Sequence, residues 1–77
     1  MNRRNNWQDL LVLANEDLAK QKFCITITDP EGDGCFQCDI FNNGVLEETY
    51  AENYYEDELP DLIMDAWHYV KEEYFEL

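Results

Sequence analysis

The 77-residue chain has few basic residues and no long hydrophobic segment. Only 5 lysines and arginines stand against 18 aspartates and glutamates, which gives a net charge of −13. Such a field repels nucleic acids and anionic lipids and attracts cationic surfaces. No apolar run reaches membrane-spanning length, and the opening MNRRNNWQDL lacks the apolar core of a signal peptide. We therefore expect a cytoplasmic protein that binds neither a membrane nor nucleic acid directly.

Cysteine and glycine are also scarce. The 3 cysteines, an odd number, do not make a disulfide framework, and in a reducing cytoplasm we expect Cys24, Cys35 and Cys38 to be thiols. The 3 glycines fall in turns and form no phosphate-binding loop. This length supports one domain at most, and a hydrophobic share of 45% is enough for a small core. We therefore expect a single acidic domain over residues 1–77.

Hydrophobic spacing predicts the order of the secondary structure. Apolar residues recur every three or four positions over residues 7–20 and again from about Leu59, which predicts two helices, the first capped by Asn5 or Asn6. Alternation predicts strands over 23–28, 35–41 and 45–51, and Asn-Gly at 43–44 predicts a hairpin. The expected fold is α+β: a helix, a three-stranded antiparallel meander with one face open, and a C-terminal helix. On the third strand Leu46 and Tyr50 are expected to point inward and Glu47 outward.

The turn between the first two strands imitates half of a calcium loop. Asp29, Glu31, Asp33 and Gly34 match the first, third, fifth and sixth positions of an EF-hand loop. Ile40 occupies the twelfth position and cannot ligate, and the flanking segments are predicted strands where the motif needs helices. We therefore expect a charged turn rather than a calcium site.

The cysteines raise the alternative of a zinc or redox site. Tetrahedral zinc needs four converging ligands, and the chain offers Cys24, Cys35, Cys38 and His68. Because Cys35 and Cys38 are three apart on a predicted strand, their side chains should point to opposite faces. We expect Cys38 to be a small core residue, no metal, no cofactor and no enzymatic activity, although spacing alone does not exclude a Cys–His pair.

The acidic residues concentrate in the second part of the chain. Residues 29–77 carry every acid except Asp9, Glu16 and Asp17, and their only lysine or arginine is Lys71. Carboxylates at next-but-one strand positions stand roughly 6 to 7 Å apart and can resemble a phosphate backbone. The plain alternative is a solvated acidic surface with no partner. The predicted partner-binding residues are Asp39, Glu47, Glu48, Glu52, Tyr54, Tyr55, Glu56, Asp57, Glu58, Asp61 and Asp65.

Four segments together carry a family resemblance: WQDLL at the first helix, KFCITITD at the first strand, CDIFNNGVLEETY at the hairpin, and ENYYEDELPDLI before the last helix. Their order in a short, very acidic chain resembles the small phage-encoded anti-CRISPR proteins that inhibit type II CRISPR nucleases by DNA mimicry. The resemblance implies a non-enzymatic inhibitor in the cytoplasm of a phage-infected host.

In that family, acids on the hairpin and adjoining helices occupy the site where the nuclease reads the short duplex motif beside its target. By position, the resemblance implies roles for Asn43 and Glu47 on the hairpin and for Glu56, Asp57 and Glu58 on the helical side. The family's tight turn carries a carboxylate where this chain has Asn43. A multi-subunit CRISPR complex is an equally open target.

Two other binding functions share features with this pattern. An antidote-type protein, such as an immunity protein or antitoxin that caps a basic toxin or nuclease, also uses acids. The double-stranded-RNA-binding domain has the same element order but needs lysines at the start of its last helix, where this chain has EDELPD. RNA binding is therefore not expected.

Overall fold

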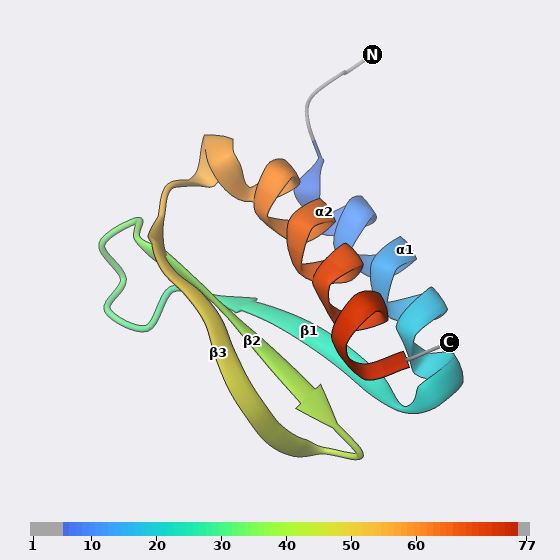
Figure 1. Cartoon of the computed structure of the whole chain (residues 1–77). Coiled ribbons are helices and arrows are strands. Elements are labelled where there is room, and N and C mark those ends of the chain that lie inside the picture. Colours follow the sequence, from blue (N-terminus) through green and yellow to red (C-terminus); the bar gives the residue numbers. More distant parts are fainter. Residues whose placement is uncertain (1–5, 76–77) are drawn as a thin grey trace.

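Two helices lie against one face of a three-stranded antiparallel sheet and leave the other face uncovered (Figure 1). The computed structural model describes residues 6–75. The helices and strands are α1 (Trp7–Leu18), β1 (Phe23–Thr28), β2 (Phe36–Asn42), β3 (Val45–Tyr54) and α2 (Leu59–Val70). Short 3₁₀ turns follow α1 and precede α2, and a π turn, Lys71–Phe75, follows α2. The predicted α+β order of helix, meander and helix is confirmed.

The two helices run parallel, and a tryptophan–carboxylate hydrogen bond ties them at each end. Near their starts, Trp7 Nε1 donates to Glu56 Oε2 over 3.2 Å. Near their ends, Trp67 Nε1 donates to Asp17 Oδ2 over 2.8 Å, and Lys71 Nζ reaches the same oxygen at 2.9 Å. The contacts of Asp17, chiefly its hydrogen bonds with Trp67 and Lys71, lower the pKa of this carboxyl from its ordinary 3.8 to about 2. Asn6 holds the capping position of α1 but its side chain makes no capping hydrogen bond, and Asn5 lies outside the described residues.

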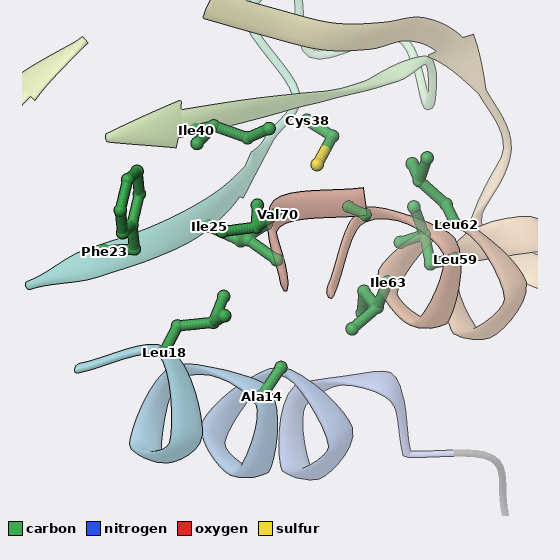
Figure 2. Close-up of a cluster of buried hydrophobic side chains, with 11 residues drawn as sticks. Ala14, Leu18, Phe23, Ile25, Cys38, Ile40, Leu59, Leu62, Ile63 and Val70 are labelled. Carbon is green, nitrogen blue, oxygen red and sulfur yellow. The ribbon is translucent and has the colours of Figure 1, made fainter. Parts of the chain in front are cut away.

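The core lies between the helices and the covered face of the sheet (Figure 2). Side chains from β1, β2 and both helices point to a common centre there, as their helical and alternating spacing predicts. None of the buried residues within 6–75 is polar or charged. They are Ala14, Leu18, Phe23, Ile25, Cys38, Ile40, Leu59, Leu62, Ile63, Ala66 and Val70. The prediction that Cys38 is a small core residue is thereby confirmed.

The Asn-Gly hairpin joins β2 to β3 as predicted, with positive φ angles of 58° at Asn43 and 81° at Gly44. β3 extends to Tyr54, three residues beyond its predicted end, because Tyr54 pairs with Phe36 and packs against the core. Residues 52–54 therefore belong to β3.

The inward orientation predicted for Leu46 is wrong. The register between β2 and β3 slips between Ile40, opposite Glu48, and Phe41, opposite Leu46. This irregularity places an extra residue on β3 and reverses the alternation beyond it, so that Leu46 faces away from the core and is 52% exposed. Tyr50 is half-buried against the core, and Glu47 is exposed, as predicted.

The two edges of the sheet are finished differently. At β1, the side-chain amide of Asn15 on α1 accepts from the Ile25 backbone N–H at 2.8 Å and donates to the Ile25 carbonyl at 3.0 Å. This pair substitutes for a neighbouring strand. At β3, the other edge strand, register irregularities break the regular pairing with β2. The strand also carries several glutamates, which place negative charge along this edge. No helix of the described part is long and apolar enough to cross a membrane.

Candidate partner-binding surface

No lysine or arginine occurs between Lys22 and Lys71, a stretch that contains the whole sheet and all of α2. His68 is the only residue there that can carry positive charge, and it is exposed beside Glu72, with its Nε2 3.1 Å from that carboxylate. Within residues 6–75 the lysine ion pairs involve Lys20 and Lys71, and both go to Asp17 on α1. The sheet and the outer side of α2 therefore carry negative charge that no nearby lysine neutralises.

Tyrosines and acids alternate where β3 lies beside α2. Glu48 Oε2 accepts hydrogen bonds from the hydroxyls of Tyr69 at 2.7 Å and Tyr74 at 2.8 Å. The ring of Tyr50 lies 4.8 Å from that of Tyr69, measured between centroids. We call Glu48, Tyr50, Asp65, Tyr69 and Tyr74 the β3–α2 cluster. Glu48 was predicted to bind a partner, and the structure directs its Oε2 to these two tyrosines.

The π turn after α2 brings the two tyrosines together. Residues five apart in an α-helix of 3.6 residues per turn point about 140° away from each other. The wider π turn over Lys71–Phe75 returns Tyr74 to the side of Tyr69, and both hydroxyls reach the same oxygen of Glu48. The sequence offered no signal for this pairing, because α-helical spacing separates the two residues.

The charge around this cluster raises the pKa of its tyrosines. The hydrogen bond to the Glu48 carboxylate, followed by partial burial, raises the pKa of Tyr69 and of Tyr74 to about 12. The pKa of Tyr50 is raised first by partial burial and then by the Asp65 carboxylate. Asp65 precedes Tyr69 by four residues on α2, so it shares the side of the helix on which Tyr69 packs against Tyr50.

The acidic turn before α2 has a structural role at two of its three positions. The Tyr55 backbone N–H donates to Glu58 Oε1 over 2.9 Å, which closes the turn, and Glu56 holds Trp7 as described above. Acids at this place also suit the positive end of the α2 dipole. Asp57 is exposed and forms no hydrogen bond or ion pair with any residue in 6–75. Of the two tyrosines predicted to bind a partner, Tyr54 packs on the core and Tyr55 is 59% exposed.

Asp39 stands on the uncovered face in a hydrogen-bonded group. Its Oδ1 accepts from the Thr49 hydroxyl at 2.8 Å, and its Oδ2 accepts from Gln37 Nε2 at 3.1 Å. These contacts fix the carboxylate at the middle of β2. The hairpin candidate Asn43 is exposed, and its backbone N–H donates to the Lys22 carbonyl.

The remaining predicted acids are exposed and have no hydrogen-bond or ion-pair partner within the described residues. One of them, Glu47, lies at the register irregularity of β3, and the other three line the path from the end of β3 along α2. Asp61 and Asp65 are four apart on α2 and share one side of the helix. The structure therefore divides the predicted set into acids with internal contacts and acids open to a partner: Glu47, Glu52, Asp57, Asp61 and Asp65.

The loop that imitates a calcium site directs its first carboxylate inward. Asp29 accepts hydrogen bonds from the backbone N–H groups of Gly32 at 2.9 Å, Asp33 at 3.2 Å and Gly34 at 3.2 Å. Asp33 in turn accepts from the Cys35 N–H at 3.1 Å. The residue types that suggested a metal loop thus stabilise a turn. Residues 6–75 contain no cluster of three or more His, Cys, Asp or Glu side chains that could hold a metal ion.

The three cysteines are free thiols, as expected, in different surroundings. Burial raises the pKa of Cys38 to about 12, so this thiol stays protonated in the core. Cys24 on β1 and Cys35 in the loop just before β2 are both partly buried and make no disulfide.

Comparisons with protein-family models, with curated proteins and with solved structures found no match to this chain. The surface chemistry described above therefore carries the functional argument by itself.

Proposed function

We propose that this protein is a non-enzymatic inhibitor that binds the basic nucleic-acid-binding groove of a partner by DNA mimicry. The proposed target is a CRISPR nuclease complex, whose recognition of target DNA the inhibitor blocks. One observation carries the proposal: the acids from Glu47 to Asp65 have no lysine or arginine between them, and several have no internal partner.

Repulsion between neighbouring carboxylates destabilises the free protein, and binding to a cationic partner removes this repulsion. Like charges four apart on a helix, such as Asp61 and Asp65, destabilise it by about 0.2 to 0.5 kcal/mol. A groove lined with arginine and lysine replaces this repulsion with attraction and speeds the encounter. The exposed Tyr55 adds an aromatic side chain of the kind that is enriched at interfaces.

In the proposed mechanism the inhibitor occupies the DNA-binding groove of the nuclease and catalyses no reaction. CRISPR nucleases read a short duplex motif through arginines that contact bases, and they hold the displaced strand in a positive channel. Carboxylates at those arginines exclude the DNA phosphates and base edges from the same donors. Binding should therefore weaken steeply with salt, because charges are screened over about 8 Å at physiological ionic strength.

The test is capture of a guide-loaded nuclease complex with and without target DNA. We expect capture by the free complex and loss of capture once target DNA is bound. Equal capture in both states contradicts the mechanism of groove occupation. Capture of a single-chain basic toxin or nuclease in place of the CRISPR complex points to the antidote function.

A pair of matched variants locates the surface. Asp61→Asn with Asp65→Asn removes two exposed acids from α2, and we expect affinity for the complex to fall at least about tenfold, or ~1.4 kcal/mol. Asp9→Asn with Glu16→Gln removes the same charge from α1 and should change affinity much less. Equal losses in both pairs would show that net charge alone drives binding. Glu56 and Glu58 are left unchanged because they also stabilise the fold.

A further inference from the structure

The helices leave one face of the sheet uncovered (Figure 1), and the two ends of this face differ in chemistry. Strand alternation and the register place Cys24 and Thr26 of β1 on it, together with Gln37, Asp39 and Phe41 of β2. From β3 it receives Leu46 and Thr49, which stand opposite Phe41 and Asp39. None of the three strands carries a lysine or arginine.

One end of this face is an acidic hollow beside the loop between β1 and β2. A cavity of about 180 Å³ lies there, lined by Glu31, Asp33 and Glu52. Pro30, Cys35, Phe36, Gln37 and Asn53 complete the lining. Glu31 and Glu52 are exposed and form no hydrogen bond or ion pair with any residue in 6–75. Carboxylates around a hollow of this size suit the cationic head of one arginine or lysine side chain.

The other end is apolar and lies at the hairpin between β2 and β3. Leu46 is 52% exposed and Val45 is 63% exposed, and Phe41 stands opposite Leu46. Neither Phe41 nor Leu46 belongs to the core or packs against it. Phe41 lies four positions after Gln37 of the hollow along β2, which corresponds to roughly 13 Å at about 3.3 Å per residue.

Charge decides between the possible occupants of this face. A nucleic acid is repelled, and a second copy of the sheet brings more carboxylates and no lysine or arginine. A basic protein segment complements the acidic hollow with its cation and can cover the apolar end with an aliphatic side chain. Interfaces that combine an apolar anchor with charged contacts follow this pattern.

We infer that the uncovered sheet face docks a segment of a basic protein, with an arginine or lysine in the hollow of Glu31, Asp33 and Glu52 and an apolar side chain on Phe41 and Leu46. The inference rests on the proposed function in its choice of a basic protein as partner. It adds a second contact surface, because the acids of α2 lie on the opposite side of the sheet from this face.

The experiment uses the full chain and an acetylated, amidated pentapeptide, Arg-Thr-Thr-Thr-Leu, whose ends match the spacing of the two sites. We expect the backbone amide resonances of Gln37, Leu46 and Glu52 to shift with one common saturation curve. Replacing the peptide arginine with citrulline keeps the shape and removes the charge, and the Kd should rise at least tenfold. Replacing the peptide leucine with alanine should reduce the amide shift at Leu46 more than the shifts at Gln37 and Glu52.

Variants of the protein supply the second readout. Glu52→Gln and Leu46→Ser should each weaken peptide binding several-fold. Asp9→Asn and Met64→Ser are matched controls, since Asp9 is exposed on α1 and Met64 is 50% exposed on α2, and neither should weaken it. Shifts confined to the helices, or equal affinity for the arginine and citrulline peptides, overturn the inference.

The two proposals fail separately. If the protein competes with target DNA but does not bind the peptide, the sheet-face inference is wrong and the proposed function stands. If the protein binds the peptide but does not compete with target DNA, the proposed function is wrong and the docking surface stands.

Discussion

The two faces of the sheet have different roles, although neighbouring residues of the same strands point to one face or the other. On the covered face, Ile25, Cys38 and Ile40 are fully buried beneath α1 and α2, and Glu48 is held by two tyrosine hydroxyls. On the uncovered face, Leu46 projects into solvent, and the acids of the hollow have no cationic neighbour. The comparison teaches that the fold is specified on one face, which leaves the composition of the other face open to selection for binding.

The largest expected difference separates Ile40 from Leu46. Ile40→Ala should lower the free energy of unfolding by about 2 to 5 kcal/mol, because it leaves a cavity in a small core. Leu46→Ala should change it by less than about 0.5 kcal/mol, since that side chain is already half-exposed. Urea unfolding followed by circular dichroism measures both. Comparable losses would mean that the uncovered face also stabilises the fold.

The same comparison extends to the edge of the sheet at β1. Asn15→Ala removes two hydrogen bonds to the Ile25 backbone, and unfolding should become easier by about 1 to 3 kcal/mol. Its neighbour on α1, Glu16, is exposed, and Glu16→Ala should be nearly neutral. Hydrogen exchange at the Ile25 amide should speed up in the first variant only. Unchanged protection at that amide would contradict the edge-capping role.

Glu48 and Glu47 give a smaller contrast within β3. Glu48→Ala removes the acceptor of the Tyr69 and Tyr74 hydroxyls and should cost about 1 kcal/mol, while Glu47→Ala should cost little. The more specific readout is tyrosine ionisation, followed by absorbance near 295 nm. In the native protein the pKa of both tyrosines is about 12, and Glu48→Ala should lower it. An identical titration curve in the variant would show that Glu48 does not set these pKa values.

The smallest effect concerns pH and the tie between the helices. The pKa of Asp17 is about 2 in the folded protein against an ordinary 3.8, so its ionised form favours folding. That contribution is complete above about pH 4 and is lost as the pH falls toward 2. The stability gap between the native protein and Asp17→Asn should therefore narrow over this range in acid unfolding experiments. A gap that stays constant would place the stabilisation elsewhere than in the charge of Asp17.

Most of the fold could be predicted from periodicity, and the exceptions have physical causes. The helical stripe of α2 and the alternation of β1 and β2 placed Leu62, Ile63, Ile25 and Cys38 in the core, because the period of each element determines which side chains share a face. The orientation of Leu46 could not be predicted in this way. One extra residue in the β3 pairing reverses the alternation, and no residue type in VLEETY marks that position.

The acidic composition of the candidate surface could be predicted from the sequence, but the role of each acid could not. The charge pattern identified the acids from Glu47 to Asp65, yet it could not tell which of them have structural contacts. Glu48 and Glu56 bind side chains more than twenty residues away, Tyr69, Tyr74 and Trp7, and such contacts follow from tertiary packing alone. The acidic hollow escaped prediction for the same reason, because it joins the loop at residues 30–35 to Glu52 on β3.

One measurement tests the central claim most directly: the affinity of the protein for a guide-loaded CRISPR nuclease complex before and after that complex has bound its target DNA. The account predicts tight, salt-sensitive binding before loading and none that is detectable after it, with Asp61→Asn and Asp65→Asn together weakening the first value. Undiminished affinity for the DNA-loaded complex, or binding that the two substitutions leave intact, would contradict it.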